Sequence, residues 1–92
     1  MIKYKVIWTP RAKKDLFKLP KHILLSIKER VESYLSINPF GMGCKPLKGN
    51  MKGFMRYRCF GVYRVIYKLN RGELEIIITE VELRRDAYKN RG

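Results

Sequence analysis

Acidic residues are missing from a long internal stretch of this chain, because residues 33–72 contain no Asp or Glu. Eight cations lie in that stretch: Lys45, Lys48, Lys52, Arg56, Arg58, Arg64, Lys68 and Arg71. Over all 92 residues, 21 Lys and Arg against 8 Asp and Glu leave a net charge of +13. Such a field destabilises a small domain by self-repulsion, which a polyanionic ligand relieves. The charge therefore predicts nucleic-acid binding; an acidic protein, a membrane surface or a merely solvated face are the alternatives.

Residue types that commonly carry catalysis or bind metals are scarce. The only histidine, His22, is expected at the surface near the start of a helix. Cys44 and Cys59 form no CxxC motif, so we expect two free thiols. Three acids fall late in the chain: Glu80, Glu82 and Asp86. Arginines are interleaved with them and no histidine is near, so we predict no metal site and no cofactor.

Long hydrophobic runs are also missing. No apolar segment approaches the ~20 residues that span a bilayer. The first ten residues, MIKYKVIWTP, alternate apolar and basic side chains, unlike the continuous apolar segment of a signal peptide. The length predicts one domain over residues 1–92. We expect a cytoplasmic protein with no membrane partner.

The first part of the chain predicts a strand followed by two helices. Period-2 alternation over residues 2–8 is typical of a strand. Thr9 and Pro10 then give a helix start, with a hydroxyl at the N-cap and proline at the first helical position. Pro20 either ends this short helix or bends it into the next. An apolar stripe over residues 23–35 predicts a second helix, antiparallel to the first.

The second part predicts a sheet. A basic loop over residues 40–50 precedes three strand-like runs: residues 54–60, 63–69 and 74–81, with turns at Gly61 and at Asn70-Arg71-Gly72. The order is β-α-α-β-β-β. The expected fold class is therefore α+β, an antiparallel sheet packed against an N-terminal helical hairpin.

The segment MRYRCFGVYRVIY, residues 55–67, is the strongest candidate site. Alternation along a strand places Arg56 and Arg58 on one face, and Arg64 can reach the same region after the turn. Guanidinium groups on rigid strands are well placed to bind a phosphate through paired N–H donors. Three aromatic residues could stack on bases, although most are expected in the core: Tyr57, Phe60 and Tyr63. Alternatively the arginines pair with acids of the next strand: Glu73, Glu75, Glu80 or Glu82. One such pair is expected, because these acids are too few to neutralise all the arginines.

Any catalysis would rest on Arg, Lys and Tyr. These groups can stabilise negative charge at a phosphorus centre. Tyrosine titrates near ~10, but surrounding positive charge lowers that pKa, so a tyrosine among arginines could act as a base.

Three motifs occur in a familiar order: KPLKG, FMRYRCFGVYRVIY and VELRRDAYK. Together with the helical hairpin and the strand order, they resemble the RelE/ParE toxin superfamily over the whole chain. The RelE branch implies a RelE-like fold and a toxin of a type II toxin–antitoxin system. Such a toxin is a ribosome-dependent mRNA endonuclease that inhibits translation. Its cleavage is metal-independent, because the RNA 2′-hydroxyl attacks the adjacent phosphate.

The resemblance also implies roles for individual residues. Arg64 and Arg84 would hold the scissile phosphate and its developing charge. Arg56 and Arg58 would neutralise and orient it, and Tyr88 would transfer a proton or stack on a base. Further RNA-binding positions are Lys45, Lys48, Lys52 and Arg85. Leu83 stands where many RNA-cleaving relatives have a histidine, so this chain resembles the histidine-free type that relies on Lys, Arg and Tyr.

The implied partners are mRNA, the ribosome and a RelB-like acidic antitoxin, and a heterotetramer is one arrangement that the resemblance allows for the toxin–antitoxin complex. A cationic surface favours an acidic, extended peptide that folds on binding. Two alternatives stay open: a ParE-like inhibitor of DNA gyrase without nuclease activity, and an inactive RNA-binding homologue.

Overall fold

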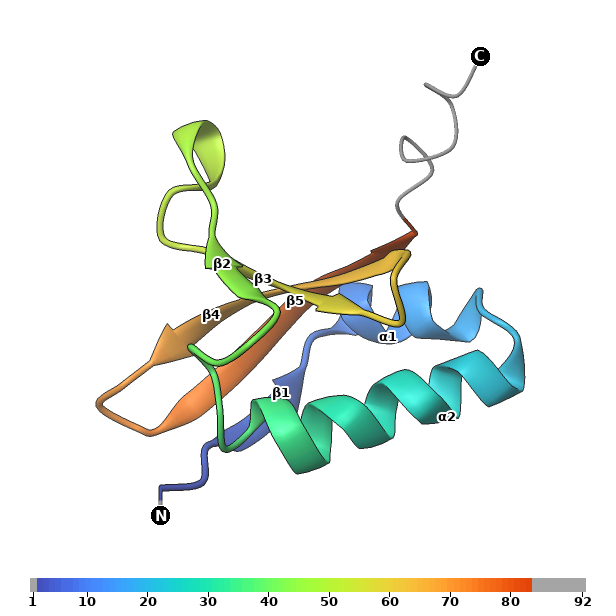
Figure 1. Cartoon of the computed structure of the whole chain (residues 1–92), viewed down its shortest axis with the longest axis horizontal. Helices are drawn as coiled ribbons and strands as arrows, with labels where there is room; N and C mark the ends of the chain where they lie inside the picture. Colours follow the sequence, from blue (N-terminus) through green and yellow to red (C-terminus); the bar gives the residue numbers. More distant parts are fainter. Residues whose placement is uncertain (1, 84–92) are drawn as a thin grey trace.

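A five-stranded sheet forms the centre of the computed structural model, which describes residues 2–83 (Figure 1). The strands are β1 (Lys5–Trp8), β2 (Cys44–Pro46), β3 (Met55–Cys59), β4 (Tyr63–Asn70) and β5 (Glu75–Leu83). Their spatial order is β1-β5-β4-β3-β2. The predicted α+β class and the three consecutive late strands are confirmed.

Two features of the sheet differ from the expected antiparallel arrangement. First, β1 pairs with β5 in parallel, so the sheet is mixed. The helical hairpin returns the chain before the late strands begin, and periodicity alone does not give the direction in which β1 meets β5. Second, the loop predicted over residues 40–50 contains β2, which pairs with β3. Three residues are too few to show an alternating pattern, so β2 depends on its partner strand.

The helices begin where the sequence predicts. They are α1 (Pro10–Phe17) and α2 (Lys21–Arg30), and α2 continues as a π-helical turn, Val31–Leu35. The Thr9 hydroxyl accepts a hydrogen bond from the Ala12 amide at 3.2 Å, which caps α1. The same hydroxyl donates to the Ile78 carbonyl at 2.8 Å and so ties the start of α1 to β5. Within residues 2–83, no helix combines the length and the apolar character needed to cross a membrane.

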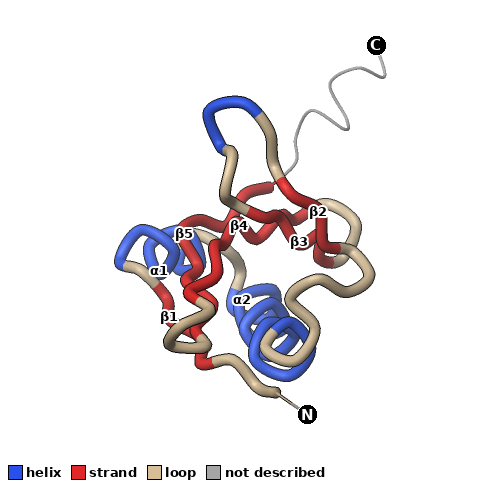
Figure 2. The backbone as a smooth tube through the Cα atoms, turned by 90° about the vertical axis from the view of Figure 1, so that its left-hand side faces the viewer, coloured by secondary structure: helices blue, strands red, loops and turns tan. Residues whose placement is uncertain are grey.

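The core lies between the helices and one face of the sheet (Figure 2). From the helical segments it receives Ala12, Leu16, Ile27, Val31 and Leu35. From the strands it receives Tyr57, Cys59, Val65, Tyr67, Ile76, Ile78 and Val81. Because side chains alternate along a strand, the intervening residues of β3, β4 and β5 lie on the opposite face.

A β-bulge in β5 sets which residues share that opposite face. If β4 and β5 stayed paired in the register of Asn70–Glu75 along their whole length, Arg64 would lie beside Val81. Instead the register shifts between Ile66 and Tyr67, and Arg64 lies beside Glu82. Thr79 is the extra residue, and its hydroxyl donates to the Ile66 carbonyl at 3.2 Å.

Candidate functional site

Two rows of side chains cross the sheet on the face opposite the core. The first row consists of Lys45, Arg56, Ile66 and Glu80. The second row consists of Arg58, Arg64 and Glu82. In the first row the cations lie on β2 and β3, in the second they lie on β3 and β4, and in both rows the single acid lies on β5. The predicted sharing of a face by Arg56, Arg58 and Arg64 is confirmed.

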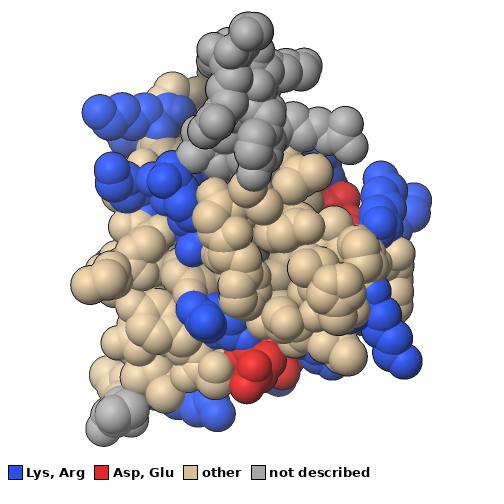
Figure 3. Space-filling view, turned by 45° about the vertical axis from the view of Figure 1, so that its right-hand side comes forward, with Lys and Arg blue, Asp and Glu red and all other residues tan. Residues whose placement is uncertain are grey.

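Positive charge also dominates a wider face of the molecule. On the face drawn in Figure 3, Lys and Arg surround a central area of other residues, while Asp and Glu occupy only small areas. Such a distribution attracts polyanions from a distance.

Arg58 lies directly opposite Arg64 in the antiparallel pair of β3 and β4. The Arg58 amide donates to the Gly43 carbonyl at 3.0 Å, on the side away from β4. Arg58 and Arg64 therefore form a non-hydrogen-bonded pair, the type in which Cα atoms lie only about 4.5 Å apart. Like charges so placed repel each other. Within residues 2–83, the exposed Arg58 guanidinium has no hydrogen bond or ion pair, so an anionic ligand would relieve this repulsion.

Arg64 makes the ion pair that the sequence predicted for one of these arginines. Its Nε and Nη2 atoms donate to the same Glu82 oxygen, Oε1, at 2.9 and 2.5 Å. Both side chains remain partly exposed, at 34% and 36%. The positive charge of Arg64 is thus balanced from β5, whereas that of Arg58 is not balanced by any described residue.

A small hollow of about 200 Å³ opens at the β2 edge of the two rows. Its lining consists of Gly43, Cys44, Lys45, Arg56 and Arg58. The Arg56 Nη1 atom donates to the Gly43 carbonyl at 3.2 Å, the same oxygen that receives the Arg58 amide. Gly43 has φ +92°, and a Cβ there would lie 3.2 Å from the Tyr57 ring. Three cations therefore converge on a hollow with no acid in its lining, and the bend that shapes it requires glycine.

The other predicted binding residues lie elsewhere. Lys48 and Lys52 are exposed and flank a short 3₁₀ helix, Gly49–Met51, in the loop that projects from the sheet (Figure 1). They do not join the two rows. Arg84, Arg85 and Tyr88 lie outside the described residues.

The aromatic residues of the candidate segment face away from the rows. Tyr57 is buried and stacks on Tyr34, with 5.7 Å between ring centroids. Phe60 lies under the Arg30 guanidinium of α2, which is 5.1 Å from its centroid. Burial raises the pKa of the Tyr57 hydroxyl, although its hydrogen bond with Arg30 opposes the shift. The pKa of this tyrosine therefore moves in the direction opposite to the one a general base requires.

The thiols and the histidine behave as the sequence predicts. Cys44 and Cys59 are free, and His22 is exposed. Burial raises the pKa of Cys59 to about 11, and it also raises the pKa of Cys44 despite the nearby Arg56. Neither thiol is activated as a nucleophile.

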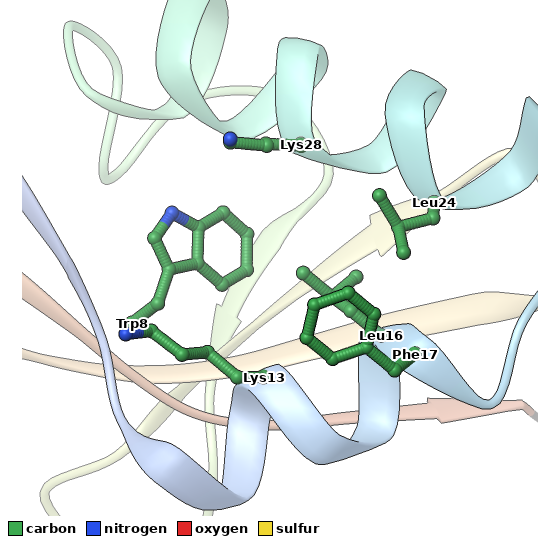
Figure 4. A pocket seen from close by; sticks show the side chains of 6 residues that line it. All are labelled: Trp8, Lys13, Leu16, Phe17, Leu24 and Lys28. Atoms are coloured by element: carbon green, nitrogen blue, oxygen red, sulfur yellow. The ribbon is translucent and has the colours of Figure 1, made fainter. Parts of the chain in front are cut away.

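Two features of the structure were not predicted. The Gly43 carbonyl and the start of β2 shape the cationic hollow, and their only sequence signal is a glycine in a loop. An apolar hollow of about 440 Å³ also lies on the helix side of the molecule (Figure 4). It is lined by Trp8, Lys13, Leu16, Phe17, Leu24 and Lys28. Figure 4 shows the two lysines on either side of the indole ring.

Known proteins resemble this chain in both sequence and fold. Residues 6–88 match the family model described as "ParE toxin of type II toxin-antitoxin system, parDE". Toxin RelG of Mycobacterium tuberculosis is 35% identical over 86 residues, covering 94% of this chain and 97% of that relative. Toxin RelE of the same organism is 34% identical over 86 residues, covering 94% and 87%.

A solved structure shows the same architecture. In the toxin–antitoxin complex RelBE2 from Mycobacterium tuberculosis, one chain matches with a TM-score of 0.83 and 32% identity. The match covers 90% of this chain and 100% of that chain. The RelE-like fold predicted from the sequence motifs is thereby confirmed.

Proposed function

We propose that this chain, which belongs to the ParE toxin family of type II toxin–antitoxin systems, is a ribosome-dependent mRNA endonuclease that inhibits translation. One observation carries the proposal. Lys45, Arg56, Arg58 and Arg64 share one face of the sheet, and three of them line a hollow without an acid. The similarity to toxins named RelG and RelE favours RNA as the polyanion.

The reaction is attack of an RNA 2′-hydroxyl on the adjacent phosphate. Negative charge increases on the phosphate oxygens in the transition state. Guanidinium groups that are already held in place stabilise that charge without reorganising during the reaction. Arg58 and Arg64 are the best placed to do so, because they lie side by side on paired strands.

The remaining roles follow from the family resemblance. Arg84 joins Arg64 on the scissile phosphate, and Tyr88 transfers a proton or stacks on a base. Arg56 and Lys45 hold the RNA beside the reacting phosphate. Lys48 and Lys52, which project on the loop, and Arg85 contact RNA farther along the strand. The reaction needs no metal and no cofactor, since the nucleophile belongs to the substrate.

The physiological partners are mRNA on the ribosome, in the cytoplasm, and an acidic antitoxin. The RelBE2 structure is a toxin–antitoxin complex, and this chain shares its toxin-like fold. A net charge of +13 favours an acidic antitoxin that folds as it binds.

The test is cleavage of mRNA in programmed ribosomes by the purified chain, with mapping of the cut ends. The wild type should cut at the ribosomal A site. Arg64→Ala should reduce the rate about 100-fold or more, the usual effect of removing one such transition-state contact. Arg71→Ala is the matched control, because Arg71 is exposed and stacks on Phe40 at 4.9 Å, away from the two rows. Its rate should stay close to that of the wild type.

The same preparation also decides between the proposal and its rival. Inhibition of gyrase supercoiling without any mRNA cleavage would favour the ParE-like function that the family name suggests. RNA binding without either activity would indicate an inactive homologue.

A further inference from the structure

Glu82 contacts Arg64 in the way that a phosphate would. One carboxylate oxygen accepts from both Nε and Nη2 of the guanidinium. Arginine uses the same fork of donors for carboxylates and for phosphates. Two of the donor atoms that Arg64 would offer to RNA, Nε and Nη2, are therefore engaged by a residue of the same chain.

The Arg64–Glu82 pair is held loosely enough to exchange. Both side chains are about one-third exposed, and ion pairs in such positions contribute little to stability. Arg58, on the other side of Arg64, has no ion-pair partner within residues 2–83. An arriving phosphate would meet both guanidiniums, whereas among the described residues Glu82 is paired with Arg64 alone.

The neighbouring acid on β5 offers a contrast. Glu80 lies on the same face, but its carboxylate pairs with Arg11 of α1 at 3.2 Å. Ile66 separates it from Arg56 in the first row. Glu80 and Glu82 thus carry the same charge on the same strand, and among the ion pairs within residues 2–83 it is Glu82 that engages a cation of the second row.

We propose that Glu82 is an intramolecular competitor for the RNA phosphate at Arg64, so that RNA binding exchanges the carboxylate for a phosphate. This inference rests on the proposed function, because it assumes that RNA reaches the second row. Glu82 then limits the RNA affinity of the free toxin. It does not touch the reacting atoms, and it acts through Arg64 alone.

The experiment measures binding of the full chain to a short, fluorescent RNA that is 2′-O-methylated throughout. This RNA lacks the nucleophile, so binding is separated from cleavage. Glu82→Gln should lower the dissociation constant about two- to five-fold, the range that the loss of a partly exposed ion pair allows. Glu80→Gln, the control with the same change of charge, should bind close to the wild type. The wild type and the two variants are compared at one fixed salt concentration.

A second pair of variants ties the effect to Arg64. In an Arg64→Gln background, Glu82→Gln should no longer change the dissociation constant. Arg64→Ala gives a second such background, and thermal unfolding checks that each variant is folded. Equal effects of Glu82→Gln and Glu80→Gln would overturn the proposal, as would a gain that persists without Arg64. Weaker binding by Glu82→Gln would also overturn it, because Glu82 would then orient Arg64 for RNA.

The two proposals fail in different ways. Tighter binding by Glu82→Gln together with no cleavage on ribosomes would refute the nuclease and keep the competitor. Cleavage on ribosomes together with an unchanged dissociation constant for Glu82→Gln would keep the nuclease and refute the competitor. No binding of this RNA by the wild type or any variant would refute the competitor.

Discussion

Replacing Arg58 with glutamine should stabilise the fold while it weakens the proposed activity. Arg58 and Arg64 are directly opposed on β3 and β4, and within residues 2–83 only Arg64 has an acidic partner. The substitution removes the repulsion and keeps an unbranched polar side chain. It leaves the Arg64–Glu82 pair intact.

The magnitude follows from the geometry of the pair. Directly opposed like charges cost about 0.2–1 kcal/mol in a sheet. In a domain of this size, 1 kcal/mol moves the melting temperature by about 4–8 °C. We therefore expect a rise of about 1–8 °C at low salt. At 1 M salt, where the Debye length is ~3 Å, most of the rise should vanish.

The assay is thermal unfolding at low and high salt, followed by circular dichroism. Lys52→Gln is the control, because it removes the same charge from an exposed loop position. Arg64→Gln should gain less than Arg58→Gln, since it also loses the Glu82 contact. A melting temperature for Arg58→Gln no higher than that of Lys52→Gln would refute the argument. The rise would then reflect net charge rather than the opposed pair.

Other parts of the structure give further predictions. Tyr67→Phe should destabilise the fold by about 1–3 kcal/mol in urea unfolding, because the buried Tyr67 hydroxyl donates to the Pro39 carbonyl at 2.6 Å, and that oxygen would lose its partner. Gly43→Ala should destabilise by about 1–3 kcal/mol through its positive φ, and should weaken RNA binding because Arg56 and Arg58 both hydrogen-bond the Gly43 carbonyl. In the folded chain, iodoacetamide should modify Cys44 and spare the buried Cys59, as mass spectrometry can show. Folding raises the pKa of Cys59 from 9.0 to about 11, because the thiol is buried. The contribution of this shift to the stability of the folded state is fully present below pH 9.0 and is lost as the pH rises toward 11. The urea midpoint should therefore fall over that range. Urea midpoints of the two variants equal to that of the wild type, a midpoint that does not change between pH 9 and 11, or equal labelling of the two thiols would contradict these expectations.

Local features of the fold could be predicted from the sequence because they depend on neighbouring residues. Thr9 and Pro10 fix the start of α1 through a cap that spans three residues. The alternation of Arg56, Tyr57, Arg58 and Cys59 assigns faces within a single strand. The short turn after Cys59 then places Arg64 opposite Arg58.

Features that depend on distant contacts could not be predicted. The parallel pairing of β1 with β5 joins residues about seventy positions apart along the chain. The choice of Glu82 as the partner of Arg64 depends on the bulge at Thr79. Without that extra residue, Val81 would occupy the position beside Arg64. The sequence offered four acids and no means of selecting one, because nothing in the local pattern marks the bulge.

The candidate site illustrates why a functional surface departs from the rules of a stable sheet. Opposed arginines and a hollow lined by three cations both disfavour the folded state. Such a cluster persists when a ligand supplies the missing negative charge. In the proposed function, that ligand is the RNA backbone.

The measurement that tests the central claim most directly is cleavage of a ribosome-bound mRNA whose 2′-hydroxyl is removed at a single A-site nucleotide. The proposed reaction takes its nucleophile from that position. The account predicts that the unmodified mRNA is cut there, that the upstream fragment ends in a 2′,3′-cyclic phosphate, and that the 2′-deoxy mRNA is not cut. Equal cutting of both mRNAs would contradict it, because the attacking group would then come from water or from the protein.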